Sequence, residues 1–500
     1  MSDALTYFLM SWTDLKLLAL VAAGSFAGIY IGAIPGLSVT MAVSILISFT
    51  FSWDILSALA LMAGIYMGGV YGGSRTAILL NIPGTVASVA TALDGYPLAK
   101  KGEAGEAIGL STVMSFVGGL LGVAVLAIAA PIISEFTIMF QPRDYLMLGI
   151  MGLLLVGALS GESLSKGIFS GALGLVIGMI GLDPITAQER FTFGNELLWS
   201  GISPIAVMIG LFGISEVIYQ LHHLNAPIVK QKLERIIPRW SDVKKYFGIS
   251  MQSSSIGVVV GALPGAGGDI AALLAYDNAR RVTRNPEVPF GHGAKEGLVA
   301  SESANNAAVG GAYIPMLTLG IPGDAVTAVM IGALYIHGLN PGPLLLVERP
   351  EMFWFTVGTL VLACIFMLIG GLTGIRVFSK LVEVPKGILL PLITLLSVVG
   401  AFGINNSVTD VWFMLGFGVL GYFMRQYRFP LGPAILGVIL FRIIDDNWRR
   451  AIISSRESLP DFFWGIFTSP LSMGLFLFIV LVILGQTPLW RMVFRKKAIA

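Results

Sequence analysis

The sequence predicts an all-α, polytopic integral membrane protein with about 11 to 15 membrane passes, arranged as two inverted-topology repeats with Pro-Gly-broken helices or hairpins. Three observations lead to this prediction. Hydrophobic residues make up 55% of the 500 residues, whereas charged residues make up 12%, about half the share in soluble domains. The chain contains 61 glycines, nearly double the usual share. Pro-Gly motifs also recur, in the same order, in both halves of the chain.

The same composition excludes several classes of protein. A disordered chain is polar and rich in charge, which this chain is not. Cys364 is the only cysteine, so disulfides do not hold the fold. The net charge of +2 gives no electrostatic footprint for a nucleic acid. The four histidines show no spacing typical of metal ligands, so we predict no metal centre and no cofactor, and we leave a Na⁺ site open.

Apolar segments of about 20 residues can each cross a bilayer as a helix. The uninterrupted candidates are 107–130, 145–160, 167–182, 198–219, 353–374, 387–403, 411–424 and 467–488. Two longer apolar regions, 17–51 and 56–93, are interrupted by Pro-Gly. Asp3 and Asp14 precede the first cation of the chain, so we expect the first apolar run to be a retained membrane element and not a cleaved signal peptide.

Lys and Arg collect in cytoplasmic loops of membrane proteins. The basic stretch 221–246 is therefore predicted to be a cytoplasmic linker between a first transmembrane repeat, 1–220, and a second repeat with an extra C-terminal helix, 247–500. The same scheme places the C-terminus in the cytoplasm and the N-terminus in the periplasm. It leaves four cations outside, namely Arg442, Arg449, Arg450 and Arg456, partly balanced by Asp445, Asp446, Glu457 and Asp461.

An internal duplication is indicated by two matches in register. In what we name copy one, YIGAIPGLS (30–38) is followed by LLNIPGT (79–85). In copy two, VVGALPGAG (259–267) is followed by TLGIPGD (318–324). The basic loop lies between the motifs in copy two but after the second motif in copy one, so the two copies are expected to have opposite orientations. Inverted repeats with broken helices near the midplane are typical of secondary transporters.

Pro-Gly inside an apolar segment ends one helix and lets another begin. Irregular backbone at membrane depth persists only where it is buried or lines a cavity, and a new helix start presents free N–H groups that attract an anion. Ser38 and Thr85 could also be ordinary N-caps. We predict a substrate-binding site from the breaks and nearby hydroxyl and amide groups, namely Pro35, Gly36, Ser38, Asn81, Pro83, Gly84, Thr85, Gly265, Asn305, Asn306, Pro322, Gly323 and Thr327.

Charged side chains inside the apolar segments are scarce, so each is a functional candidate. The candidates for cation coupling or charge pairing are Arg75, Asp269, Glu302 and Asp324. The arginine could neutralise an anionic substrate, and the three carboxyl groups could carry a proton or help to bind Na⁺. The alternative is structural pairing, such as Arg75 with Asp324. Asp94, in contrast, is interpreted as a loop residue.

Long stretches of the chain resemble the large membrane subunit of the tripartite tricarboxylate transporters, the TctA-like proteins. The resemblance rests on GAIPGLS, on the glycine-rich segments 64–85, 261–280 and 301–324, and on HGLNPGP at 337–343. It covers nearly the whole chain. It implies cation-coupled uptake of di- and tricarboxylates such as citrate across the bacterial inner membrane, with H⁺ or Na⁺ as the coupling ion. It also implies two partners, a small four-helix membrane subunit and a periplasmic solute-binding protein, and no enzyme activity.

Two other functions remain as alternatives. An intramembrane aspartyl protease would use Asp269 and Asp324, but Ala266 occupies the first glycine position of the Gly-x-Gly-Asp motif, and Tyr276-Asp277 follows that motif instead of preceding it. An uncoupled anion channel would also need a polar path through the membrane. Broken helices and embedded carboxyl groups favour ion coupling over a passive pore.

Overall fold

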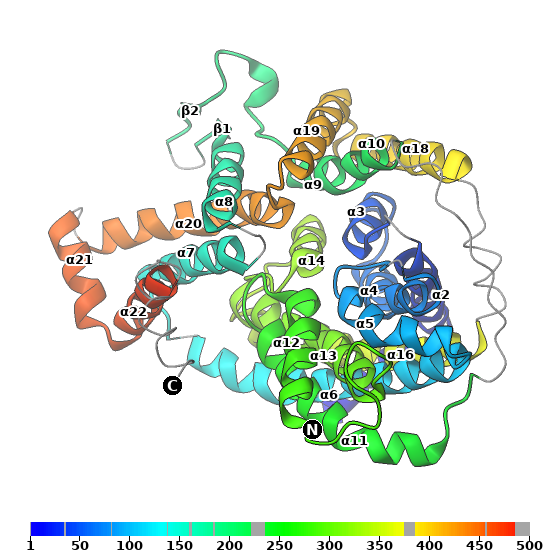
Figure 1. The fold of residues 1–500 in the computed structure, drawn as a ribbon. Coiled ribbons are helices and arrows are strands. Elements are labelled where there is room, and N and C mark those ends of the chain that lie inside the picture. Colours follow the sequence, from blue (N-terminus) through cyan, green and yellow to red (C-terminus); the bar gives the residue numbers. More distant parts are fainter. Residues whose placement is uncertain are drawn as a thin grey trace. The chain divides into compact units, whose positions relative to one another are not determined.

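The computed structural model describes residues 2–34, 37–81, 83–137, 139–159, 163–183, 186–221, 236–374, 386–455 and 458–485. The chain forms two compact units, here named unit 1 (Met1–Ser134 and Ile205–Tyr422) and unit 2 (Glu135–Pro204 and Phe423–Ala500). The described part is almost entirely helical, as predicted, with one two-stranded antiparallel sheet (Figure 1).

Unit 1 contains both copies of the repeat. Its helices are α1 (Ser2–Thr13), α2 (Leu15–Ala33), α3 (Val39–Thr50), α4 (Ile55–Leu80), α5 (Ser88–Lys100), most of α6 (Ala104–Thr137), α9 (Pro204–Met208), the π-helix η2 (Ile209–Ile214), α10 (Ser215–Leu221), α11 (Trp240–Gly261), α12 (Gly267–Val282), α13 (Lys295–Leu319), α14 (Ala325–Ile336), α15 (Leu345–Glu348), α16 (Pro350–Thr373), α18 (Lys386–Asn405) and most of α19 (Val408–Gln426).

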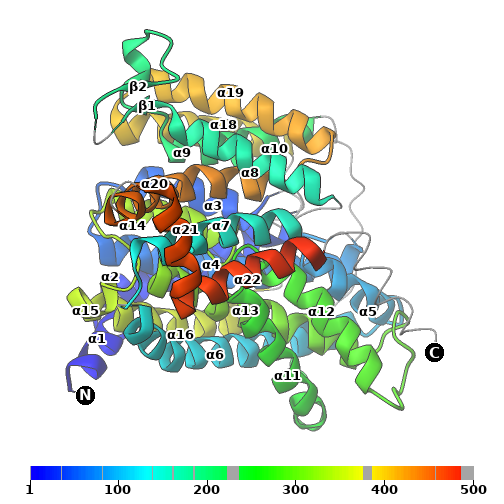
Figure 2. The same ribbon diagram turned by 90° about the vertical axis from the view of Figure 1, so that its left-hand side faces the viewer.

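Unit 2 is smaller. Its elements are α7 (Pro142–Leu159), α8 (Leu164–Met179), β1 (Gly181–Leu182), β2 (Glu189–Arg190), the 3₁₀-helix η1 (Glu196–Leu198), α20 (Leu431–Ser454), α21 (Leu459–Thr468) and α22 (Pro470–Gly485). Within it, α20 packs on α7 and α8, and α22 packs on α7 (Figure 2).

Several helices are long and apolar enough to cross a membrane. Among the described residues there are five, namely Leu15–Ala33, Ile55–Leu80, Ala104–Thr137, Pro204–Leu221 and Pro350–Thr373. The bent pair α21 and α22 would add a sixth. Four more apolar helices have 10 to 17 residues, too few to cross alone, and two of them follow Pro-Gly breaks. The total of 11 to 15 passes therefore stays a prediction, while a multi-pass membrane protein is confirmed.

The Pro-Gly motifs interrupt helices, as predicted. α4 ends at Asn81, whose φ of 56° places it in the left-handed region, and α13 ends at Gly320 with a φ of 70°. These two residues occupy equivalent positions in the aligned motifs. Copy two has a further left-handed residue, Gly265, between α11 and α12. A left-handed residue stops a helix because it turns the next N–H away from the helix axis.

Glycine and alanine allow the long helices of each copy to pack closely. A Cβ atom at Gly68 of α4 would lie 2.2 Å from the carbonyl oxygen of Ser25 in α2. In copy two, a Cβ atom at Gly261 of α11 would lie 2.4 Å from the carbonyl oxygen of Ala308 in α13. Both distances are far below a van der Waals contact, so the backbones meet directly. Figure 1 shows α2 beside α4.

Polar N-caps start several of the helices. Ser38 caps α3 by accepting the N–H of Met41 at 3.0 Å, and Asp54 caps α4 by accepting the N–H of Ser57 at 2.9 Å. Asp54 also pairs with Lys16 at 2.8 Å. Burial raises the pKa of Asp54, but the hydrogen bonds from Lys16 and Ser57 outweigh it and lower this pKa to about 2.

The end of the predicted linker 221–246 is helical, since α11 begins at Trp240, and residues 222–235 lie outside the described residues; the division into two repeats joined by this linker stays a prediction. Two predicted span boundaries are wrong. The predicted span 198–219 starts at Pro204, because the preceding backbone turns at Gly201 with a φ of 76°. The predicted span 467–488 is divided between α21 and α22 by a bend of 93°, since Pro470 starts a new helix.

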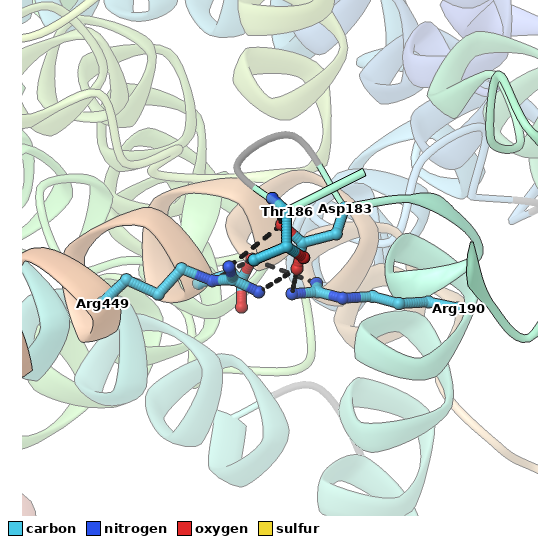
Figure 3. Close-up of polar contacts among 5 residues, drawn as sticks. Asp183, Thr186, Arg190 and Arg449 are labelled. Atoms are coloured by element: carbon cyan, nitrogen blue, oxygen red, sulfur yellow. Dashed lines mark hydrogen bonds and ion pairs between the residues drawn. The ribbon is translucent and has the colours of Figure 1, made fainter. Parts of the chain in front are cut away.

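Four charged side chains pair in unit 2 (Figure 3). Asp183, which follows β1, accepts hydrogen bonds from Arg190 of β2 and from Arg449 of α20, the latter at 3.0 Å to Nη1. Asp445 accepts from the same two arginines at 3.1 and 3.3 Å. Thr186 donates its backbone N–H to Asp183 at 2.9 Å. Arg449 is thus paired with two carboxylates. The predicted orientation places Arg449 outside the cytoplasm, where an unpaired cation would argue against it, and the pairing weakens that argument.

Candidate functional site

The predicted site residues fall into three groups. Those with accessible surface are Ser38, Asn81, Pro83, Gly84, Thr85, Gly265, Asp269 and Asp324. Those that are buried are Arg75, Glu302, Asn305, Asn306, Pro322, Gly323 and Thr327. Pro35 and Gly36 lie outside the described residues. The accessible group thus includes residues of both copies, all at or next to Pro-Gly motifs.

The start of α5 binds a carboxylate from the other copy. The N–H of Ala87 donates to Oδ1 of Asp269, which lies in the first turn of α12, at 3.0 Å. Ala87 has no side-chain oxygen to cap α5, and the next three N–H groups, on Ser88, Val89 and Ala90, bond to carbonyl oxygens of copy one, so the N–H of Ala87 is the donor that Asp269 binds. Asp269 is itself exposed although it lies among apolar segments. Asp269 of copy two thus contacts the start of α5 of copy one directly.

The other break carries a second carboxylate. Asp324 caps α14 in a reciprocal capping box with Thr327: it accepts the N–H of Thr327 at 2.8 Å, and its own N–H donates to Oγ1 of Thr327 at 2.9 Å. The phenol of Tyr66, on α4 of copy one, also donates to Asp324. Gly267, at the start of α12, would place a Cβ atom 2.9 Å from the Cβ of Asp324. The starts of α12 and α14 therefore meet.

The two second breaks are built in the same way. A Cβ atom at Gly84 would lie 2.3 Å from the carbonyl oxygen of Gly32, and one at Gly323 would lie 2.6 Å from that of Gly261. Gly84 aligns with Gly323, and Gly32 aligns with Gly261. Each Pro-Gly turn thus rests on the end of the preceding long helix of its own copy, and only glycine fits at the contact.

The long helices of the two copies meet through amides. Asn306 of α13 donates to the carbonyl oxygen of Met67 of α4 at 3.4 Å, and Asn305 donates to that of Val70 at 3.1 Å. In the aligned repeats Met67 and Asn306 are equivalent positions. A contact between equivalent residues is the mark of a two-fold relation between their elements. The packing of α4 on α13 therefore agrees with the duplication.

Glu302 is fully buried in α13 and is held by hydroxyl groups alone among the described residues. Its Oε1 accepts from Ser74 of α4 at 2.6 Å and from Thr91 of α5. Its Oε2 accepts from Ser115 of α6 at 3.0 Å. Three helices of copy one thus bind one carboxyl group of copy two.

Arg75 is directed to the end of a helix. Its Nη2 donates to the carbonyl oxygens of Gly370 at 3.0 Å and Gly371 at 2.6 Å, in the last turn of α16, and its guanidinium stacks on Tyr71. A cation at the carbonyl end of a helix is stabilised by the helix dipole. We interpret this contact as structural, and a role of Arg75 in coupling stays a prediction.

Asp94 was interpreted as a loop residue, but it is buried in α5. Its Oδ1 accepts the backbone N–H groups of Gly291, Gly293 and Ala294, each at 2.8 Å. One carboxylate of copy one thereby fixes the loop that leads into α13 of copy two. The residues 284–294 are polar and rich in Pro and Gly, so the sequence alone did not reveal that this loop returns to α5.

We expect Asp94→Ala to destabilise the protein by about 2–5 kcal/mol, because it leaves two buried N–H groups and one half-buried N–H group without their acceptor. Thermal unfolding of the purified protein in detergent measures this effect. Asp277→Ala is the matched control, since Asp277 is half-exposed on α12 and its ion pair among the described residues is with Arg281 four residues on, so its loss costs about 0.5 kcal/mol or less. Equal losses for the two variants would contradict the assignment.

The hydroxyl groups around the embedded carboxyl groups were not predicted. They are Tyr66, Ser74, Thr91 and Ser115. Two of them do carry a sequence signal, since Tyr66 and Ser74 lie in the glycine-rich segment 64–85. Spacing within a helix shows which residues share a face, but it does not show which other helix that face contacts.

The geometry combines two kinds of groups. Copy one contributes the N–H of Ala87, the exposed amide of Asn81 and hydroxyl groups, which are donors. Copy two contributes the carboxyl groups of Asp269, Glu302 and Asp324, which are acceptors. The described contacts of these carboxyl groups therefore join the two copies.

The chain was compared with known proteins. The model of the tripartite tricarboxylate transporter TctA family matches residues 18–436. The chain belongs to this family. An uncharacterized 52.8 kDa protein of the TAR-I ttuC' 3' region of Agrobacterium vitis is 34% identical over 436 residues, which is 87% of this chain and 86% of that protein. An uncharacterized protein of the TAR-II ttuC' 3' region is 35% identical over 233 residues, covering 46% of this chain and 94% of that protein. No solved structure matches.

Membership of the TctA family confirms the resemblance read from the glycine-rich segments. The family is one of transporters and not of enzymes, and it belongs to tripartite systems, which implies partner subunits. The matched region, 18–436, includes every predicted site residue. It includes both copies of the repeat as well.

Proposed function

We propose that this chain is the large transport subunit of a secondary importer that couples the uptake of di- or tricarboxylates to the inward movement of H⁺ or Na⁺. It acts in the bacterial inner membrane by alternating access, with its C-terminus in the cytoplasm and its N-terminus in the periplasm. Its partners are a small four-helix membrane subunit and a periplasmic solute-binding protein that delivers the substrate. The family match and the embedded carboxyl groups support this proposal.

The observation that carries the proposal is the carboxylate of Asp269 on the N–H of Ala87. A substrate carboxylate could take the place of Asp269 on this N–H, helped by the exposed amide of Asn81. Asp269 would repel that anion while it is charged. A cation bound close to the site reduces this repulsion, so anion and cation binding favour each other.

The proposal is tested in proteoliposomes that contain the chain with the partner subunits of its own system. Labelled citrate, malate and succinate are offered under a pH gradient, under a Na⁺ gradient, and with both collapsed. Uphill uptake of one carboxylate with either gradient supports the proposal. Uptake that reaches only equilibrium under all conditions favours an uncoupled anion channel, and no uptake of any carboxylate contradicts the assignment of the substrate class.

We expect Asn81→Gly to lower carboxylate uptake by about tenfold or more, because one hydrogen bond to a charged group is lost. Glycine keeps the left-handed backbone that ends α4, so the break itself is retained. Initial uptake rates, normalised to the amount of protein in the membrane, measure the effect. Unchanged rates would remove Asn81 from the substrate site. Asn406→Gly, at another left-handed asparagine, is the matched control.

A further inference from the structure

Glu302 contacts both sides of the broken span in copy one. Ser74 lies on α4, before the break at Pro83 and Gly84, and Thr91 lies on α5, after it. Both hydroxyl groups donate to the same oxygen, Oε1 of Glu302. One carboxyl group of copy two therefore holds together the two half-spans between which the substrate site is proposed.

The link from Glu302 to the break is short. Ser74 follows Gly73, whose carbonyl oxygen accepts the N–H of Gly84 at 3.4 Å. A Cβ atom at Gly73 would lie 2.6 Å from Oγ1 of Thr85. A change in the hydrogen bonds of Glu302 thus acts on the turn of α4 against which the break residues pack.

The surroundings of Glu302 supply no cation by hydrogen bond or ion pair within the described residues. The charged or titratable side chains on the four helices that meet at Glu302 are Tyr66, Tyr71 and Arg75 on α4, Asp94, Tyr96 and Lys100 on α5, Glu106 and Glu135 on α6, and Lys295, Glu296 and Tyr313 on α13. Lys295 pairs with Glu106 at 2.6 Å, and Asp94 accepts from loop N–H groups. A buried carboxylate whose partners are neutral hydroxyl groups is costly when charged, so a proton is the simplest way to neutralise it.

The geometry fits a proton better than Na⁺. The hydroxyl oxygens of Ser74 and Ser115 lie 2.6 and 3.0 Å from the carboxyl oxygens, which are the distances of direct O–H···O hydrogen bonds. A hard cation needs about six oxygen ligands at open positions around it, whereas a proton needs only the carboxyl oxygen and one acceptor.

Glu302 can also be protonated without leaving any of the three hydroxyl groups unpaired. When Glu302 gains a proton, one carboxyl oxygen becomes a donor, so the hydroxyl group that faces it accepts this bond and must direct its own hydrogen elsewhere. Each of the three hydroxyl groups lies in a helix and can turn to the carbonyl oxygen four residues before it, which Ser and Thr often do. The site therefore has two fully hydrogen-bonded states, one charged and one neutral.

We propose that Glu302 binds the coupling proton, and that its proton sets how tightly α4 and α5 are held on either side of the Pro83-Gly84 break. This inference rests on the proposed carboxylate transport and adds the identity of the coupling ion and its binding residue. When Glu302 is charged, it accepts from all three hydroxyl groups and holds the two half-spans together. When it is protonated, the bonds join neutral groups and are weaker, so the break can move.

The test uses proteoliposomes with the full transporter, with the membrane potential set to zero by valinomycin and equal K⁺. The probe is whichever of labelled citrate, malate and succinate the wild-type protein takes up fastest. A gradient of 1 pH unit supports about tenfold accumulation for each coupled proton. For Glu302→Gln we expect an accumulation ratio of about 1, no substrate-induced acidification of the lumen, and downhill uptake within about threefold of wild type, since coupling alone is lost.

Glu296→Gln is the matched control, because it makes the same substitution at another buried glutamate of α13. It should keep the wild-type accumulation ratio. Accumulation by Glu302→Gln at the wild-type ratio would overturn the inference. So would wild-type accumulation that responds to a Na⁺ gradient and not to a pH gradient, although carboxylate transport would then stand. Absence of wild-type uptake under every gradient would instead contradict the proposed function.

Two milder variants test whether Glu302 binds the coupling proton if Glu302→Gln does not fold. Thr91→Val and Ser115→Ala each remove one donor that stabilises the charged carboxyl group. Each should move the alkaline limit of uptake upward by about 1 pH unit, because protonation then persists to higher pH. A purely structural role would lower the rate at every pH and leave the limit in place, which would overturn the inference.

Discussion

Replacing Asp324 by asparagine should lower carboxylate uptake by at least about 100-fold, which corresponds to about 2.7 kcal/mol in the transport barrier. Asparagine is as good an N-cap as aspartate, so it can still accept the N–H of Thr327 and start α14. The charge is lost, and with it the strong acceptor for the phenol of Tyr66. The variant therefore separates the charge of this residue from its role as a cap.

The measurement is the initial uptake rate at equal amounts of membrane-inserted protein. Thr327→Ser is the matched control, because it keeps the hydroxyl group that completes the capping box, and it should stay within about threefold of wild type. Normal transport by Asp324→Asn would show that the carboxyl group acts only as a helix cap. Loss of the inserted protein would show instead that asparagine does not preserve the start of α14.

Replacing Gly68 by valine should prevent stable folding, with a cost of about 3 kcal/mol or more. Even a Cβ atom there would lie 2.2 Å from the carbonyl oxygen of Ser25, and backbone atoms cannot yield as a flexible side chain does. α2 and α4 would have to separate along their whole contact. The amount of folded protein, measured by size-exclusion chromatography in detergent, should fall at least about tenfold.

Gly248→Val provides the contrast within the same type of helix. Gly248 lies in α11, and a Cβ atom there meets nothing within 4 Å. Valine has a higher helix propensity than glycine, so the protein should be unaffected or slightly stabilised. If both variants are recovered at wild-type amounts, the close approach of α2 and α4 is not a requirement of the fold.

The fold could be predicted from the sequence to the extent that it depends on local chemistry. Proline cannot donate at the breaks, and glycine accepts the tight contacts, so the interruptions after α4 and α13 were foreseeable from Pro83 and Pro322. The helix boundaries at Trp240 and Pro204 were not, because a basic or polar stretch can be a loop or the exposed start of a helix. The π-helix η2 has no evident signal in its apolar sequence.

The candidate site was predictable in its residues more than in its contacts. Asp269, Glu302 and Asp324 stand out because charge is expensive in an apolar segment. Their partners depend on which helices of the two copies face each other, and that information is not in the periodicity of either helix. Arg75 illustrates the difference: the sequence suggested an anion or a carboxylate as its partner, and the structure gives it the carbonyl oxygens of Gly370 and Gly371.

The contact of Asn306 with Met67 has a bearing on how such a protein could arise. Because these positions are equivalent, the same surface of each copy is used on both sides of the contact. Two separate half-length chains, inserted in opposite directions, could make this contact as a symmetric pair. Fusion of the two genes would then free each half to change alone. The two halves of this chain do differ in this way, with carboxyl groups at 269 and 324 in one half and Thr40 and Thr85 at the matching places in the other.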